Sequence, residues 1–298
     1  KAAFEQVLKI KGDDDHSKLI EMLAEVNNYS IPIEQVIDRH FDEENYYTWL
    51  AFQLLTGNGD TTSQNFFLYN PPGGSKWYFI SWDNDDAWSY EEDIVYGGET
   101  DGYRYTKGVS NYWGATLHQR MLKSESCRAK LDEKINYIRG RFTREVIEEK
   151  VQMYASVTRR FLASAPDAIY APKSMDDYEA ILGMIPSEIE HNYEMYRISL
   201  DSPMPFYLGE PTMTGDKTVF RWDPSYDFDG EDVTYKFELA RDYTFDEPID
   251  VQSGLHVAQT FTARLEPGQY FIRVTVTNES GMTQTAMQTY EGTDGIRR

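Results

Sequence analysis

Residues 60–85 read DTTSQNFFLYNPPGGSKWYFISWDND. The order of residue types in this stretch is the most informative local feature of the sequence. Two short runs rich in aromatic and β-branched residues, 65–69 and 76–82, are separated by the sequence NPPGGS. Apolar runs on either side of Pro and Gly are typical of two strands joined by a turn. The stretch therefore predicts a β-hairpin.

A hairpin returns its two ends to the same place. Pairing about a centre near residue 73 sets Asn65 opposite the residues just before Asp83, and Asp60 precedes Asn65 by five positions. We therefore expect Asp60, Asn65 and Asp83 to converge, although they span 23 positions. A carboxylate that orients a hydroxyl, together with an amide and a second carboxylate that hold a metal ion, is the arrangement that phosphoryl transfer needs.

Composition excludes several classes of protein. The chain has 298 residues with 40% hydrophobic residues, enough for one large domain or two ordinary ones. A formal net charge of -21 argues against a nucleic-acid partner, and it means that a bound nucleotide needs a divalent cation between its phosphates and the carboxylates. The single cysteine, Cys127, excludes an intrachain disulfide and is predicted to be a buried apolar residue. No apolar run approaches 18 residues, so no membrane span is predicted.

The first 200 residues are predicted to be mainly helical. Asp42 and Thr143 precede amphipathic patterns as caps, Ser174 opens a further helix, Gly57 ends one, and Pro186 bends or divides the last helical stretch. Residues 89–112 hold five tyrosines with little periodicity, which predicts a long loop over the site.

The pattern changes near residue 203 from helical to alternating. Several short strands from Pro205 onward, separated by turns such as Pro267-Gly268, predict a β-sandwich. The run 265–270 (LEPGQY) resembles the fibronectin type III domain, in which this Tyr forms a tyrosine corner, and Trp222 lies where that family has its core Trp. The resemblance covers about residues 205–290 and implies a fold rather than a function.

The spacing around the hairpin is also that of protein kinases, which place a catalytic Asp five residues before a metal-binding Asn and a second metal-binding Asp after a short hairpin. Asp60, Asn65 and Asp83 follow this order. The rest of the kinase signature is absent, because no His-Arg precedes Asp60 and Asn84-Asp85 stands in place of Phe-Gly.

At these residues the chain resembles the spore coat protein H (CotH) kinase family, over roughly residues 15–200. The segments that carry the resemblance are 41–45 (FDEEN), 55–60 (LTGNGD), 65–69 (NFFLY), Lys76-Trp77 and 82–85 (WDND). The resemblance implies an atypical, secreted or surface-associated protein kinase. Such a kinase uses ATP and a divalent metal, Mg²⁺ or else Mn²⁺ or Ca²⁺, to phosphorylate Ser/Thr-rich coat or secreted proteins.

The family's functional residues transfer to four positions of this sequence. The resemblance implies that Asp60 is the catalytic base and that Asp83 binds the metal that positions the ATP phosphates. Asn65 is a candidate second metal ligand from its spacing, and Asp85 matches the second acid of the Trp-Asp-x-Asp motif as a further metal ligand. On composition alone, Asp60 would instead be a solvated turn residue and Asn65 a residue that starts a strand.

The sequence thus predicts an α+β fold with two domains. Residues 1–202 form a mainly helical, atypical protein-kinase-like C-lobe with a catalytic β-hairpin, and residues 203–298 form an all-β immunoglobulin-like sandwich. In the family a smaller N-terminal lobe supplies the lysine that grips the phosphates. Because the chain begins at Lys1 and has no Gly-x-Gly-x-x-Gly loop, we expect a fragment without that lobe, from a bacterial protein that is extracellular or on the cell or spore surface.

Other interpretations remain open at this point. The chain fits a non-catalytic surface or assembly protein, in which a degenerate kinase lobe is joined to a sandwich that binds a surface, glycan or protein partner. Two carboxylates in a cleft would also suit a glycoside hydrolase. Residues 83–86 (DNDD) lack the Gly and Glu of an EF-hand, which leaves a different divalent site open. We interpret Trp77, Trp82 and Trp88 as core residues rather than as a platform for sugars.

Overall fold

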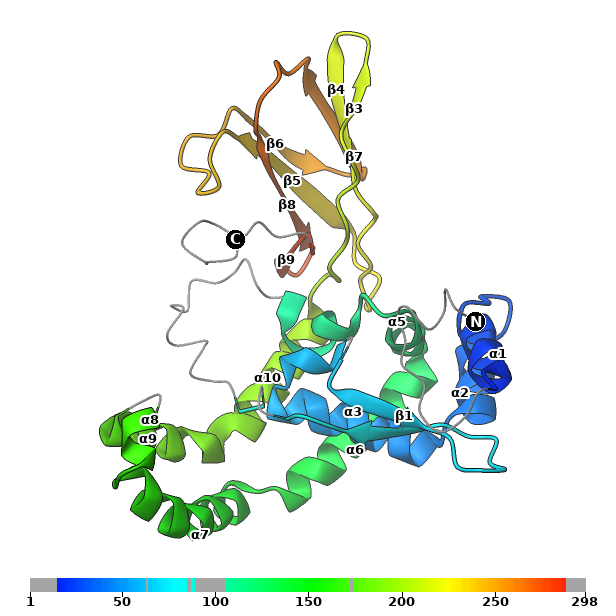
Figure 1. Cartoon of the computed structure of the whole chain (residues 1–298). Coiled ribbons are helices and arrows are strands. Elements are labelled where there is room, and N and C mark those ends of the chain that lie inside the picture. The colour runs from blue at the N-terminus through cyan, green and yellow to red at the C-terminus, as the bar shows by residue number, and fades with distance from the viewer. Residues whose placement is uncertain (1–14, 63, 85–86, 89–104, 172–173, 288–298) are drawn as a thin grey trace.

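The computed structural model describes residues 15–62, 64–84, 87–88, 105–171 and 174–287. A mainly helical part precedes two antiparallel sheets, which stand over one end of it (Figure 1). This mixed content of helix and sheet is that of an α+β chain, as predicted.

The helical part consists of short and medium helices joined by tight connections. The α-helices are α1 (Ser17–Val26), α2 (Ile33–His40), α3 (Glu43–Thr56), α5 (Thr116–Lys123), α6 (Glu125–Arg141), α7 (Arg144–Leu162), α8 (Asp167–Tyr170), α9 (Met175–Met184) and α10 (Glu188–Asp201). Short 3-10 helices are η1 (Gly59–Thr62), η3 (Gly108–Tyr112) and η4 (Ile185–Ser187). No helix in the described ranges is both long enough and apolar enough to cross a bilayer.

The predicted helix ends are confirmed. Asp42 caps α3 by accepting from the Asn45 N–H at 2.9 Å, and Gly57 ends α3 in the left-handed region at φ +66°. Thr143 caps α7 in the same way as Asp42 caps α3. Pro186 lies in η4, which divides α9 from α10. The sequence of the caps therefore fixes where the helices around the site begin and end.

The loop predicted over residues 89–112 is wrong at its C-terminal end. Residues 108–112 fold as η3, and Val109 and Tyr112 are buried. Residues 89–104 lie outside the described residues. Tyr112 therefore belongs to the core, where η3 packs against α10 and the turn before the hairpin.

The core of the helical part forms around α3, which is buried on nearly all sides. The ring of Trp49 on α3 stacks on Phe79 of the hairpin with centroids 4.4 Å apart. Cys127 of α6 is buried in the same core, as predicted. His118 of α5 is also there, with 4% of its surface exposed, and its Nδ1 lies 2.9 Å from the hydroxyl of Tyr46.

The burial of His118 makes stability depend on pH. Burial lowers the pKa of His118 to about 4, so the folded protein keeps the ring neutral while the unfolded chain binds a proton below about pH 6.5. The unfolded state therefore gains protons first, and folding stability falls as the pH drops through this window. Between pH 7.5 and 5.0 we expect the free energy of unfolding to fall by about 2 kcal/mol through this group.

Urea unfolding followed by tryptophan fluorescence at the two pH values measures this loss. His118→Leu removes the titrating group and should remove most of the difference, whereas His256→Gln, at an exposed histidine, should retain it. A His118→Leu variant that loses as much stability as the wild type on acidification contradicts the assignment.

The C-terminal part holds two antiparallel sheets. One has the order β3-β4-β7 and the other the order β6-β5-β8-β9. The strands are β3 (Thr212–Thr214), β4 (Lys217–Arg221), β5 (Val233–Ala240), β6 (Asp250–Leu255), β7 (Gln259–Ala263), β8 (Phe271–Asn278) and β9 (Thr283–Thr285). Trp222 is buried in their shared core beside Phe237, and the hydroxyl of Tyr270 donates to the Glu266 carbonyl at 3.0 Å.

Candidate active site

The predicted hairpin is present, with the predicted register. Strands β1 (Phe66–Tyr69) and β2 (Tyr78–Ser81) pair antiparallel, with Phe66 opposite Ser81. One step beyond the strands, the Trp82 N–H donates to the Asn65 carbonyl at 3.2 Å. Asn65, just before β1, and Asp83, two residues after β2, therefore lie on the same side of the hairpin, as the sequence predicts.

The hairpin is fixed to the helices by backbone and amide hydrogen bonds. The Trp77 N–H donates to the His40 carbonyl at 2.7 Å, and the Asp42 N–H donates to the Trp77 carbonyl at 3.0 Å. The side-chain amide of Asn45 accepts from the Phe79 N–H at 2.7 Å and donates to the Phe79 carbonyl at 3.1 Å. The Asn45 side chain thus pairs with the backbone of β2 as a neighbouring strand would, and this pairing fixes β2 against α3.

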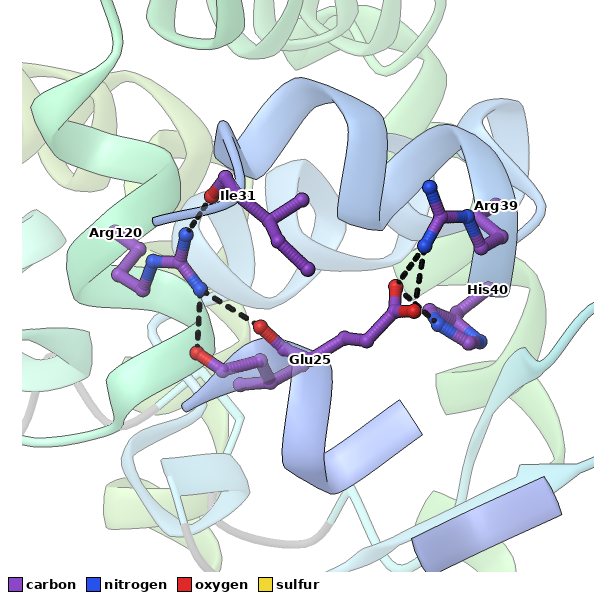
Figure 2. A network of polar contacts seen from close by, with 6 residues as sticks. Glu25, Ile31, Arg39, His40 and Arg120 are labelled. Carbon is purple, nitrogen blue, oxygen red and sulfur yellow. Dashed lines mark hydrogen bonds and ion pairs between the residues drawn. The ribbon is translucent and has the colours of Figure 1, made fainter. Parts of the chain in front are cut away.

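A polar network holds the helix ends that carry these anchors (Figure 2). Glu25 of α1 accepts from Arg39 and lies 2.9 Å from His40 Nε2, and hydrogen bonding by His40 and Arg39 holds the pKa of Glu25 below its usual value. Arg120 of α5 donates to the carbonyls of Glu25 at 3.1 Å and of Ile31. Because His40 is also the backbone anchor of Trp77, this network connects α1, α2 and α5 to the hairpin.

Asp60 and Asn65 are in direct contact. Asp60 lies in η1, directly after the turn that ends α3, and its carboxylate Oδ2 accepts from Asn65 Nδ2 at 3.1 Å. Both side chains are half-buried. Since the Asn65 amide nitrogen faces Asp60, the amide oxygen is the atom that Asn65 can offer to a metal ion.

Asp83 is exposed and lies two residues after the end of β2, beyond Trp82. Its φ of +55° and the φ of +58° at Asn65 place both residues in the left-handed region, which Asp and Asn tolerate better than other non-glycine residues. The chain after Asp83 returns to the end of α3, because the Trp88 N–H donates to the Thr56 carbonyl at 2.8 Å. Asp85 lies outside the described residues, so its role stays a prediction.

A residue to which the sequence assigned no role, Asn58, connects the two acidic segments. Asn58 is 2% exposed and its Nδ2 donates to the Asn84 Oδ1 at 3.0 Å, directly after Asp83. Its own Oδ1 is buried without a hydrogen-bond partner. The signal was present in the Gly-Asn-Gly-Asp sequence at 57–60, but the partner lies 26 positions away and only the fold reveals it.

The outer face of the hairpin is apolar and exposed. Its exposed side chains are Phe67, Tyr69, Ile80 and Trp82. Trp82 is 58% exposed and contacts Phe67 edge-on at 5.2 Å between ring centroids. The interpretation of Trp82 as a core residue is therefore wrong, because Trp82 follows the outward face of β2, whereas Trp77 and Trp88 do pack against the core.

The donor set at the end of the hairpin consists of oxygen atoms. The described residues hold no cluster of three or more His, Cys, Asp or Glu side chains that would bind a metal ion. The groups that remain are the Asp83 carboxylate and the Asn65 amide oxygen, beside the Asp60 carboxylate. Hard cations such as Mg²⁺ and Mn²⁺ prefer these ligands and keep water or phosphate oxygens in their other positions.

A shallow, open depression of about 530 Å³ lies elsewhere, between α6 and α10. Arg139 in its wall pairs with Glu190 at 2.6 Å and lies over the ring of Tyr193 at 3.5 Å. Arg139 and Glu190 thus satisfy each other, and none of the predicted site residues lines the depression. We therefore place the candidate site at the hairpin.

An acid and an amide before the first strand and a second acid after the second strand follow the order that protein kinases use. The family model described as CotH kinase protein matches residues 1–197, and the chain therefore belongs to the CotH kinase family. A search of curated proteins found no match to the chain. Membership of a kinase family points, in general terms, to ATP and a divalent metal as the groups used and to protein as the acceptor.

Proposed function

We propose that this chain carries the catalytic centre of an atypical protein kinase, which transfers the γ-phosphoryl group of ATP to a Ser or Thr hydroxyl of a coat or secreted protein. The observation that carries the proposal is the contact between Asn65 and Asp60, at the strand end where Trp82 bonds back to Asn65. This contact sets one carboxylate beside an amide just before β1, and a second carboxylate, Asp83, lies two residues after the paired strand β2.

The proposed step assigns a role to each group. Asp60 accepts the proton of the acceptor hydroxyl while the oxygen of that hydroxyl forms a bond to the γ-phosphorus. The bond between the γ-phosphorus and the oxygen that bridges it to the β-phosphorus breaks, and ADP leaves. Asp83 and the Asn65 amide oxygen would hold the divalent ion, with Asp85 as a further candidate. When bound, the ion supplies positive charge beside the phosphates, which the net charge of -21 makes necessary.

Asn65 has a second role in this proposal. Its Nδ2 donates to Asp60 Oδ2, which orients the carboxylate and leaves the other oxygen, Oδ1, free to face the acceptor hydroxyl. An amide can serve both purposes at once, because its nitrogen donates while its oxygen binds a cation. Aspartate at this position would instead place two like charges side by side.

We assign the two domains to residues 1–202 and 203–298, and the second to the fibronectin type III fold. The division into a three-stranded and a four-stranded antiparallel sheet supports this assignment. So does the Tyr270 hydroxyl, which bonds back to the Glu266 carbonyl as in a tyrosine corner. The association of the CotH family with the spore coat supports a surface location.

Transfer of labelled phosphate from [γ-³²P]ATP to a Ser/Thr-rich peptide tests the function. The purified full-length protein should label the peptide in the presence of Mg²⁺ or Mn²⁺ and lose this activity in EDTA. If no labelling exceeds that of the Asp60→Asn variant with either metal, the kinase proposal fails. The non-catalytic interpretation, a surface protein with a degenerate kinase lobe, would then be favoured.

A further inference from the structure

The short helix η3 (Gly108–Tyr112) lies between the turn that carries Asp60 and the C-terminal sheets. Val109, Ser110 and Tyr112 of this helix are all buried. A 3-10 helix of this length has little stability of its own, so its position depends on what packs against it. Contacts on one side of η3 therefore influence the position of the residues that η3 contacts on the other side.

On one side, η3 holds the turn that carries Asp60. The Tyr112 hydroxyl lies 2.6 Å from Thr61 Oγ1 and donates to the Asn58 carbonyl at 3.3 Å. Asn111 Nδ2 donates to the Gly59 carbonyl at 3.2 Å. These bonds end on the two residues before Asp60 and on the residue after it.

On the other side, η3 contacts the C-terminal sheets. Gln284 of β9 donates through Nε2 to Ser110 Oγ at 3.3 Å, and both side chains are buried. Trp113, which directly follows η3 and is 5% exposed, contacts the rings of Tyr226 at 5.5 Å and Phe228 at 5.8 Å between centroids. Figure 1 shows β9 at the end of the sheets that lies next to the helical part.

Cations of the helical part strengthen the aromatic contact. Lys123 Nζ lies over the rings of both Trp113 and Tyr226, at 5.2 and 5.1 Å from their centroids. The guanidinium of Arg128 lies over Phe228 at 4.8 Å. The loop between β4 and β5 is thus packed into the helical part rather than tethered to it by a linker.

The start of η3 is also fixed, by α10. Gly108 has φ +54°, and a Cβ at this position would lie 2.2 Å from Ser199 Oγ. Ser199 Oγ accepts from the Val109 N–H at 3.0 Å. The helix η3 is therefore anchored by α10 at its start and by the C-terminal sheets at Ser110 and Trp113.

We propose that the C-terminal sheets are a positioning element for Asp60, acting through η3. Tyr226 and Gln284 fix Trp113 and Ser110, and Tyr112 on the same short helix fixes Asn58 and Thr61. The sheets are therefore part of the catalytic unit and not a spacer. This inference rests on the proposed role of Asp60, because a displacement of about 1 Å in a catalytic group costs on the order of a hundredfold in rate.

Amide hydrogen exchange in the full-length protein tests the inference without any assay of activity. Tyr226→Ala should speed exchange of the amides of residues 58–62 about tenfold, relative to those of α6, because it removes a contact that fixes η3. Gln284→Ala is a milder variant in case Tyr226→Ala fails to fold, and it should give a smaller change of the same kind. Phe261→Ala, at an exposed aromatic of β7, is the matched control and should leave the exchange of residues 58–62 and of α6 unchanged.

A double-mutant cycle with Tyr112→Phe separates positioning from general destabilisation. If Tyr226 acts through Tyr112, each single variant lowers kcat at unchanged KM for ATP, and the double variant is no slower than the slower single one by more than about twofold. Unchanged exchange at residues 58–62, or rate losses that multiply, overturns the inference. A wild type without kinase activity overturns the proposed function, while the exchange result still decides the inference.

Discussion

Asp60→Asn is expected to lower kcat for phosphoryl transfer about 10³-fold while leaving the fold intact. A general base contributes roughly 10²- to 10⁴-fold, and asparagine cannot accept the hydroxyl proton. The fold should be retained because the new amide oxygen can still accept from Asn65 Nδ2, which now donates to Asp60 Oδ2 at 3.1 Å. Single-turnover transfer from labelled ATP to a Ser/Thr-rich peptide measures the rate, and thermal unfolding checks the fold.

The matched control is Asp176→Asn, the same chemical change at an exposed position on α9. It should keep the wild-type rate. An Asp60→Asn variant that retains a rate within about threefold of the wild type would show that no proton passes to this carboxylate, because the loss would fall far below the contribution of a general base.

The second large effect is expected at Asp83, where Asp83→Asn should weaken Mn²⁺ binding at least about 100-fold. The substitution removes the carboxylate that the proposal assigns to the ion, and a hard cation binds a neutral amide more weakly than a carboxylate. Asparagine is the suitable replacement because it tolerates the left-handed backbone at φ +55°, which alanine would strain. Electron paramagnetic resonance of free Mn²⁺ measures the affinity with no need for a substrate.

Asp229→Asn is the control for this measurement, since Asp229 is an exposed aspartate in a turn of the C-terminal sheets. Its affinity for Mn²⁺ should equal that of the wild type. Equal affinities in Asp83→Asn and the wild type would place the ion elsewhere and remove the support for metal-dependent transfer at the hairpin.

Local sequence patterns were sufficient to predict the hairpin and the helix ends. Two short aromatic-rich runs around a Pro-Pro-Gly-Gly turn set the register, and Asp42 and Gly57 mark the ends of α3. These features depend on interactions between residues close in sequence, where propensities and turn chemistry dominate. The resemblance to the CotH family added the roles that we propose for the acids, which the patterns alone left open.

Contacts between distant residues could not be predicted in this way. Asn58 meets Asn84 across 26 positions, Tyr112 meets Thr61 across 51, and Gln284 meets Ser110 across 174. None has a periodic signal, because each depends on how whole elements pack. For the same reason the sequence predicts a loop for the segment that contains η3. In the structure, Tyr112 of η3 is buried against the turn that holds Asp60.

Crystals of the protein grown with Mn²⁺ and a non-hydrolysable ATP analogue test the central claim most directly. We predict an anomalous scattering peak about 2 Å from both the Asn65 amide oxygen and a carboxylate oxygen of Asp83, with the γ-phosphate beside Asp60. A Mn²⁺ ion and nucleotide bound away from the end of the hairpin would contradict the account.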